Sequence, residues 1–298
     1  MTHPMSRRAA LGGALAVSAA AATAARAQTK TPVIEWNMHM FSSNMAKFPY
    51  HPKATYKPDP VKNPADPLVV YQKRMADEGI DRALFVQPEP YGDDHRLVLD
   101  CLHRTSPAKF KGTSLFYPRN PESPGKLAAL VKSQPRIVST RFHANRGNKN
   151  YMDSFADSGV RALWKQAVDL NLVIELHIGP SVARDAGKAV AAFPGCKVLI
   201  DHLAEQATGT PDEFADVLDL AKYPNVYMKL SGLNHYAKDA PLYENERPFT
   251  RRVIAEFGPE RMVWGSGTPK IVDAHMKGYA PSDIALVKGG NLKRLLNW

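Results

Sequence analysis

Short β-branched apolar runs alternate with longer amphipathic stretches along most of this sequence. Eight of the apolar runs have the length of strands: residues 33–40, 83–87, 112–117, 137–143, 172–178, 197–203, 226–231 and 262–266. Stretches with helical periodicity lie between them, among them residues 67–78, 94–105, 159–170, 182–193, 213–222 and 244–257. Alternation of strand and helix implies parallel strands joined by crossover helices. Eight such units predict an α/β fold, a (β/α)8 TIM barrel in a single domain. No Gly-x-Gly-x-x-Gly follows any strand, which argues against a dinucleotide-binding sheet.

The first 27 residues have a different pattern from the rest of the chain. Arg7 and Arg8 precede a run rich in Ala and Gly at residues 12–22, and Ala25-Arg26-Ala27 ends the segment. This order is typical of a twin-arginine signal peptide. The run is too short and too weakly apolar for a membrane span, which needs roughly 20 strongly apolar residues. We therefore expect a leader at 1–27, a barrel at 28–298, and a periplasmic or secreted protein without a membrane span after cleavage.

Charge and cysteine content narrow the classes of partner. Loss of the leader lowers the net charge from +10 to +7, and the remaining basic residues are scattered along the chain. Without a Lys/Arg run interleaved with aromatic residues, a nucleic-acid groove is not expected. A mild basic excess fits a small anionic substrate or an anionic envelope surface.

Cys101 and Cys196 lie far apart in apolar segments and are expected to be buried free thiols. The oligomeric state does not follow from the sequence.

Two insertions interrupt the regular spacing of strands and helices. Residues 42–66 follow the first predicted strand, and residues 144–158 follow the fourth. Both leave the carboxyl ends of strands, where barrel enzymes hold their active sites. Long loops in a compact domain are usually functional or disordered. We expect both insertions to be lids over the barrel mouth.

Polar residues recur where the predicted strands end. The two-residue strand period places Glu35, Asn37 and His39 on one face of the first strand. The same period pairs Arg141 with His143, Glu175 with His177, and Lys229 with Ser231, while His202 lies at the end of the sixth strand. A lone histidine on a strand is more often a structural residue. Five strands that end in this way indicate instead that polar side chains converge at the barrel mouth.

Taken together, these segments resemble the amidohydrolase-related group of the amidohydrolase superfamily. That group includes metal-independent lactonases acting on 2-pyrone-4,6-dicarboxylate, and related decarboxylases. The resemblance covers essentially the whole mature chain. It lies in Glu35-x-Asn37-x-His39, Leu176-His177-Ile178, Ile200-Asp201-His202-Leu203, Tyr227-Met228-Lys229-Leu230-Ser231-Gly232, Arg261-Met262-Val263-Trp264-Gly265-Ser266 and Gly290-Asn291-x-x-Arg294-Leu295-Leu296. It implies a TIM barrel that acts on a small carboxylated substrate.

Two positions depart from the pattern of the resembling family. Its first strand normally carries His-x-His, and here Asn37 takes the first of these positions. Its eighth strand normally reads Trp-Gly-Ser-Asp-x-Pro, and here Gly267 takes the place of the Asp. In metal-using members that Asp is a ligand and a general base, and in metal-free lactonases it would be the base. A catalytic zinc needs three protein ligands. His39, His177 and His202 remain, and a zinc site of three histidines is chemically possible, but we expect no metal or other cofactor.

Together with these residues, the resemblance implies a hydrolase of the lactonase or amidohydrolase-like type that acts on a small carboxylated lactone or related ester. The candidate catalytic residues are His39, His177, Glu175 and His202. The candidate substrate-binding residues are Asn37, Arg141, His143, Lys229, Ser231 and Tyr91. Asp273 and His275 are the nearest candidates in the sequence to replace the missing Asp. Two alternatives stay open: a barrel without turnover that binds a small anion, and a lyase or isomerase on the same fold.

Overall fold

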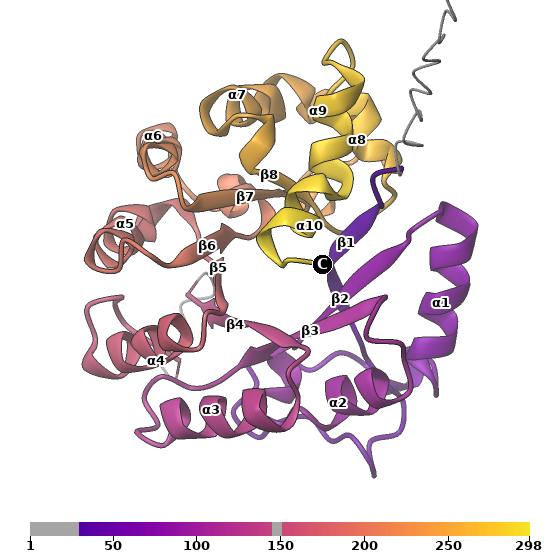
Figure 1. Ribbon diagram of the computed structural model, residues 1–298, viewed down its shortest axis with the longest axis vertical. Helices are drawn as coiled ribbons and strands as arrows, with labels where there is room; N and C mark the ends of the chain where they lie inside the picture. The colour runs from indigo at the N-terminus through magenta and orange to yellow at the C-terminus, as the bar shows by residue number, and fades with distance from the viewer. Residues whose placement is uncertain (1–29, 145–150) are drawn as a thin grey trace, which may run out of the picture. The chain divides into compact units, whose positions relative to one another are not determined.

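Eight parallel strands follow one another around a barrel in the order in which they occur in the chain (Figure 1). The computed structural model describes residues 30–144 and 151–298, and residues 31–298 form one unit. The predicted leader and residues 145–150 of the second insertion lie outside the described residues. The strands are β1 Ile34–His39, β2 Arg82–Val86, β3 Phe110–Leu115, β4 Ile137–His143, β5 Val173–His177, β6 Lys197–Ile200, β7 Val226–Leu230 and β8 Met262–Trp264. The predicted (β/α)8 barrel is therefore confirmed.

Helices form a ring outside the strands (Figure 1). Those that cross between strands are α1 Pro67–Glu78, α2 Arg96–His103, α3 Ser123–Ser133, α4 Ser158–Asp169, α5 Ala183–Ala192, α6 Pro211–Asp219 and α7 Arg247–Phe257. Three shorter helices follow β8: α8 Lys270–His275, α9 Pro281–Ala285 and α10 Asn291–Leu295. None of the described helices is both long and apolar enough to cross a membrane.

The first crossover helix, α1, shows how local sequence sets these boundaries. The side chain of Asp66 accepts hydrogen bonds from the backbone N–H groups of Leu68 and Val69, and Pro67 occupies the first helical position. Gly79 ends the helix with φ +68°, a left-handed conformation that favours glycine. The helix spans Pro67–Glu78, the range predicted from the sequence.

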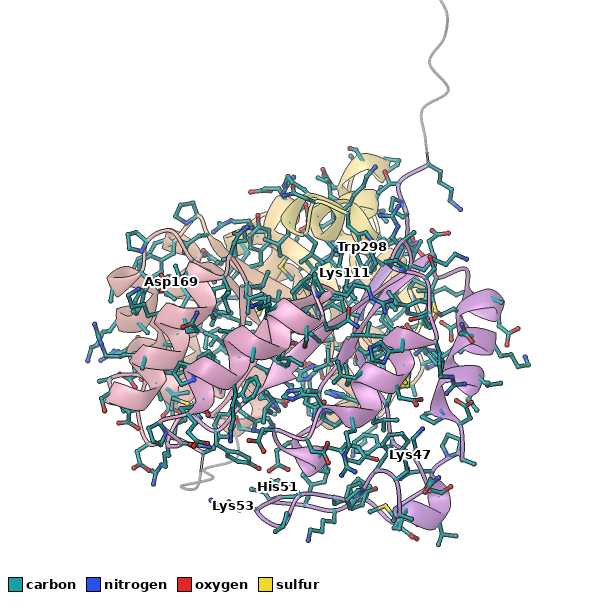
Figure 2. All side chains as sticks on the ribbon, turned by 60° about the horizontal axis from the view of Figure 1, so that its bottom comes forward. Lys47, His51, Lys53, Lys111, Asp169 and Trp298 are labelled. Atoms are coloured by element: carbon teal, nitrogen blue, oxygen red, sulfur yellow. The ribbon has the colours of Figure 1, made fainter. Side chains whose placement is uncertain are left out.

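Apolar side chains close the amino-terminal end of the barrel. Inside the ring, the buried cluster contains Ile34, Trp36, Leu84, Val86, Val173, Leu199 and Val263, together with Leu292 and Leu295 of α10. Figure 1 shows α10 and the C-terminus in the centre of the ring of strands. Trp298 lies at this end with Lys111, and His51 of the first insertion lies at the opposite end (Figure 2). The carboxyl ends of the strands therefore form the open mouth.

The last and first strands meet through a glycine. A Cβ built at Gly265, directly after β8, would overlap the carbonyl oxygen of Trp36 in β1. A side chain at this position would separate the two strands, so the close approach of β8 to β1 requires glycine. Elsewhere in the barrel, Cys101 and Cys196 are buried free thiols, as predicted.

Candidate active site

The first strand does not present the three polar residues on one face, and this prediction was wrong. A β-bulge shifts the register between Trp36 and Met38, so that the residues before and after it alternate out of phase. Glu35 lies on the outer side, where it accepts hydrogen bonds from Tyr71 at 2.6 Å and Arg74 at 3.2 Å, both on α1. His39 lies beyond the bulge, where the charges of Arg141, Lys229 and Asp201 in the barrel interior act on its pKa.

Four charged side chains form a buried layer below the mouth. Asp201 Oδ2 accepts hydrogen bonds from Arg141 Nε at 2.9 Å and Nη2 at 2.6 Å. Lys229 Nζ lies 2.5 Å from Asp201 Oδ1 and donates to Glu175 Oε1 at 2.7 Å. Two cations thus face two acids, the arrangement in which charges tolerate burial. Arg141 and Glu175 are register partners on neighbouring strands, and Asp201 directly follows β6.

Burial and mutual repulsion set the protonation of this layer. Burial raises the pKa of Glu175 to about 7, and the charge of Asp201 adds to the rise although Lys229 and Arg141 oppose it. Burial also acts to raise the pKa of Asp201, but Lys229 and Arg141 outweigh burial and hold it well below its usual range. Burial together with the same two cations lowers the pKa of His39 to about 3. His39 is therefore a neutral and weakly basic imidazole.

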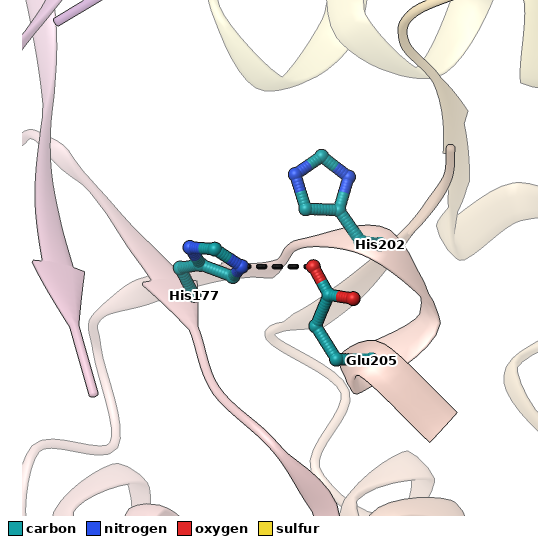
Figure 3. A group of neighbouring side chains, drawn as sticks. All are labelled: His177, His202 and Glu205. Carbon is teal, nitrogen blue, oxygen red and sulfur yellow. Dashed lines mark hydrogen bonds and ion pairs between the residues drawn. The ribbon is translucent and has the colours of Figure 1, made fainter. Parts of the chain in front are cut away.

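A second polar layer, at the mouth itself, is a chain of hydrogen-bonded histidines around one carboxylate. His177 Nδ1 lies 2.9 Å from His143 Nε2, and His177 Nε2 lies 2.9 Å from Glu205 Oε1 (Figure 3). His235 Nδ1 lies 3.0 Å and 2.9 Å from the two carboxylate oxygens of Glu205. We refer to His143, His177, Glu205 and His235 as the histidine–glutamate chain. Its members come from β4, β5 and the segments that follow β6 and β7.

An unusual backbone brings Glu205 to this position. His202, Leu203, Ala204 and Glu205 all have positive φ, between +49° and +56°. A left-handed conformation costs roughly 1–2 kcal/mol for each non-glycine residue, and such strain concentrates at functional sites. This left-handed turn also explains why β6 ends at Ile200, whereas the predicted strand ran to residue 203.

The same turn places His202 beside the end of β7. His202 Nδ1 lies 2.8 Å from Ser231 Oγ, and burial lowers the pKa of His202 well below its ordinary value. Gly232 follows with φ +70°, and a Cβ there would lie 2.6 Å from the Cβ of His202. Because Gly232 has no side chain, the His202 ring can occupy this space.

The structure brings most of the predicted site residues together, in two layers. His143, His177, His202 and Ser231 lie at the mouth, and Arg141, Glu175 and Lys229 lie in the charged layer. His39 faces the interior and donates from Nδ1 to the carbonyl of Val86 at 3.1 Å. Asn37 sits at the bulge, and its side-chain oxygen is buried without a partner among the described residues.

Tyr91 has a different setting from the other candidates. Its hydroxyl accepts a hydrogen bond from the backbone N–H of Ser42 at 3.1 Å, and its ring contacts Phe41 and Tyr50. Burial raises its pKa to about 12. No hydrogen bond among the described residues joins Tyr91 to the histidine–glutamate chain. It anchors the first insertion against the end of β2.

Sequence reasoning missed Glu205 and His235. Neither lies on a strand, so the two-residue period does not apply to them. The available signal was their position: Glu205 occurs three residues after His202 and His235 four residues after Ser231, two predicted site residues at strand ends. Apart from Tyr91, Asp273 and His275, the predicted candidates all lie on predicted strands.

Gly267 lies beside a cavity in place of the acid of the resembling family. Its φ is +72°, and a Cβ there would lie 2.7 Å from Cδ1 of Ile271. Its carbonyl accepts a hydrogen bond from Arg74 Nη2 at 2.5 Å. The cavity, of about 300 Å³, is lined by Ser231, Gly232, Leu233, Asn234, Tyr243, Ser266, Gly267 and Ile271.

The two nearest sequence candidates for a replacement acid or base are structural residues, and this suggestion was wrong. Asp273 pairs with Lys288 at 2.6 Å on the surface. His275 is fully buried; its Nδ1 lies 2.7 Å from Thr250 Oγ1 and its Nε2 donates to the carbonyl of Leu242 at 2.8 Å. Both of its ring nitrogens are therefore occupied away from the mouth.

The metal position expected from the family resemblance does not fit this chain. Gly267 offers no ligand atom, Asn37 is a poor zinc ligand, and the Nδ1 of His39 is bonded to a carbonyl. Among the described residues, ligand atoms of His177, His202 and Glu205 lie within 4.8 Å of one another (Figure 3). These three would be the residues to hold an ion, although His177 Nε2 is already hydrogen-bonded to Glu205.

Comparison with known proteins identifies the family. The profile of a family described as amidohydrolase matches residues 34–286, which is most of the chain and the whole barrel from β1 to α9. The chain belongs to this amidohydrolase family. The resemblance drawn from the strand-end motifs is therefore confirmed.

Curated relatives of this amidohydrolase are lactone hydrolases. It is 23% identical over 252 residues to 4-sulfomuconolactone hydrolase of Hydrogenophaga intermedia, and the aligned region covers 78% of this chain and 73% of the relative. It is 29% identical over 206 residues to L-fucono-1,5-lactonase of Burkholderia ambifaria, and the aligned region covers 65% of this chain and 67% of the relative. Together with the family match, these relatives confirm the prediction of a hydrolase of the lactonase or amidohydrolase-like type.

Solved structures share the fold of this amidohydrolase. A probable 2-pyrone-4,6-dicarboxylic acid hydrolase from Acinetobacter baumannii, with citric acid bound, superposes with a TM-score of 0.73 at 19% identity over 89% of this chain and 99% of that chain. An amidohydrolase from Burkholderia multivorans with bound zinc superposes with a TM-score of 0.70 at 16% identity and the same coverage. At these identities the likeness establishes the barrel alone.

Proposed function

We propose that this protein hydrolyses the lactone ring of a small carboxylated substrate, without a metal ion. The observation that carries the proposal is the histidine–glutamate chain at the mouth, set directly above the charged layer that contains Arg141. Hydrolysis of a ring ester needs a base to activate water and donors to stabilise the developing oxyanion. Imidazoles and a carboxylate meet the first need.

Arg141 is the residue that would hold the substrate carboxylate. Its Nε and Nη2 are bonded to Asp201, while its Nη1 makes no hydrogen bond to a described residue. Guanidinium–carboxylate contacts are among the strongest charge-assisted hydrogen bonds. Lys229 is fully buried and already faces Glu175 and Asp201, so it would act on the substrate through the field of the layer. The names of the curated relatives, both lactone hydrolases, support this substrate class.

The proposal that no metal ion takes part rests on the ligand atoms that the residues of the site offer. The positions that Asn37 and Gly267 occupy supply no ligand for the ion that metal-using relatives would hold there. One ring nitrogen of His177 lies within hydrogen-bond distance of His143 and the other within hydrogen-bond distance of Glu205. These contacts hold the ring in an orientation in which it can accept or donate a proton.

The test is ring opening of a panel of carboxylated lactones by the full-length protein, with and without a chelator, beside a His177→Ala variant. We expect turnover that survives the chelator and is lost in the variant. Turnover abolished by the chelator and restored by zinc would overturn the metal-free part alone. Absence of turnover on every lactone, with thermal stabilisation by one of them, would indicate an anion-binding barrel instead.

We further propose that the protein reaches the periplasm by the twin-arginine route. Arg7, Arg8 and the Ala25-Arg26-Ala27 site support this proposal. Export of the full chain should fail when Arg7 and Arg8 are both replaced by Lys, which keeps the charge. Undiminished export of that variant would contradict the proposal.

A further inference from the structure

His235 occupies a position at the mouth that resembles that of a catalytic general base. It ends the short 3-10 helix Leu233–His235 after β7, and its side chain is 37% exposed. Its Nδ1 lies 3.0 Å and 2.9 Å from the two carboxylate oxygens of Glu205. An ionised carboxylate only accepts hydrogen bonds, so Nδ1 must carry the proton. A neutral His235 therefore has its lone pair on Nε2.

The Nε2 atom of His235 is available to water. It makes no hydrogen bond to a described residue, and the His235 side chain is 37% exposed. His202 differs because it is buried and its Nδ1 is bonded to Ser231. His39 differs because it lies beside Arg141 and Lys229, two cations that oppose proton uptake.

A carboxylate holds His235 in this orientation. Glu205 sits on the left-handed turn, and it also accepts a hydrogen bond from His177 Nε2 at 2.9 Å. This second bond holds the carboxylate through Oε1, an oxygen that His235 Nδ1 also contacts. A histidine whose Nδ1–H donates to a buried carboxylate is held in one tautomer, and the imidazolium that forms during reaction is stabilised.

The cavity beside Gly267 is lined by the residues that lead up to His235. Residues Ser231, Gly232, Leu233 and Asn234, which directly precede His235, form one wall, and Ser266 and Gly267 belong to the lining after β8. The space of about 300 Å³ is sufficient for a small substrate and the attacking water.

We infer that His235 is the general base of the hydrolysis and that Glu205 is its positioning residue. The pair takes the role that the acid at the position of Gly267 has in the resembling family, and this inference rests on the proposed function. His235 Nε2 takes a proton from water as the water oxygen bonds to the lactone carbonyl carbon, and the carbonyl π electrons move to its oxygen. When the carbonyl re-forms, the ring C–O bond breaks and the imidazolium returns the proton to the ring oxygen. One water is added and one hydroxy acid results.

The first test compares kcat/KM for lactone opening in His235→Gln and His103→Gln. His103 is an exposed histidine at the end of α2, outside the site. Loss of a positioned general base lowers the rate by about 10²–10⁴-fold, and we expect this for His235→Gln but not for His103→Gln. A His235→Gly variant should regain activity with added imidazole. Wild-type rates in a folded His235→Gln variant, with active wild type, would overturn the inference and leave the proposed function intact.

The second test does not depend on a substrate. In protein labelled with 15N-histidine, the imidazole signals lost in His235→Gln belong to His235. We expect these signals to report the Nδ1–H tautomer in the wild type, and a mixture of tautomers in Glu205→Gln. An Nε2–H tautomer in the wild type would overturn the inference even if no lactone is hydrolysed, in which case the proposed function fails separately. Thermal unfolding of each variant shows whether it is folded.

Discussion

Lys229 Nζ donates to Glu175 Oε1 at 2.7 Å, and both side chains are fully buried inside the barrel. The two residues lie on different strands, β7 and β5, and Asp201, directly after the strand between them, completes the contact at 2.5 Å from Lys229. Removal of the cation would leave two acids facing each other in the interior. The stability of the barrel and the electrostatics of its mouth are thus coupled through one lysine.

We predict that Lys229→Met strongly destabilises the protein. Breaking a buried ion pair by removing one partner typically costs about 3–5 kcal/mol, because the remaining charge is uncompensated. Chemical denaturation should show this loss. The double variant Lys229→Met/Glu175→Gln should recover part of it.

The matched control is the exposed pair Lys73–Asp77 on α1, with Nζ–O at 2.6 Å and side chains 77% and 59% exposed. Exposed pairs contribute about 0–1 kcal/mol, so Lys73→Met should change stability little. Equal effects of the two lysine substitutions would contradict the buried charge layer.

We predict a specific pH dependence of stability from Glu175. Its pKa rises from an ordinary 4.5 to about 7 in the folded barrel, because of burial first and Asp201 second. The folded state therefore binds more protons than the unfolded state between these values. The contribution of this group is fully present below pH 4.5 and is lost as the pH rises through about 7. The free energy of unfolding of the wild type, minus that of Glu175→Gln, should fall across this window; a difference that rises with pH would contradict the assignment.

We predict that Gly267→Asp does not create a more active enzyme. At φ +72° a side chain is strained, and its Cβ would lie 2.7 Å from Ile271 Cδ1. The left-handed backbone alone costs roughly 1–2 kcal/mol. The variant should be less stable and no faster at lactone opening.

Gly125 provides the control for this substitution. It lies in the first turn of α3, where a Cβ would meet open space, so Gly125→Asp should be tolerated. A gain in kcat for Gly267→Asp would show that the mouth still accepts the acid of the family, and would argue against a replacement base.

The features of the fold that can be predicted from the sequence are those that repeat along the chain. Eight alternating runs predicted eight strands, and the helix at 67–78 matched α1 because its capping residues Asp66 and Gly79 are local signals. The strand-end histidines could be recognised because the strand period is two. The bulge after Trp36 reversed the predicted face of Glu35, since a register shift leaves no trace in a hydrophobic pattern.

The features that the sequence did not reveal depend on backbone conformations that do not repeat along the chain, or on contacts across the barrel. Glu205 reaches the mouth only because four successive residues adopt positive φ, three of them of types that rarely do so. The ion pairs of Lys229 with Glu175 and Asp201 join residues 54 and 28 positions apart, and nothing local predicts them. Such contacts require the closed barrel.

Ring hydrolysis is tested by lactone opening in water enriched in 18O, with the product analysed by mass spectrometry. Hydrolysis at the ring ester predicts one 18O atom, located in the new carboxylate of a product one water heavier than the substrate. A product that forms without 18O, either an isomer or a decarboxylated species, would contradict hydrolysis and assign the barrel to isomerase or lyase chemistry.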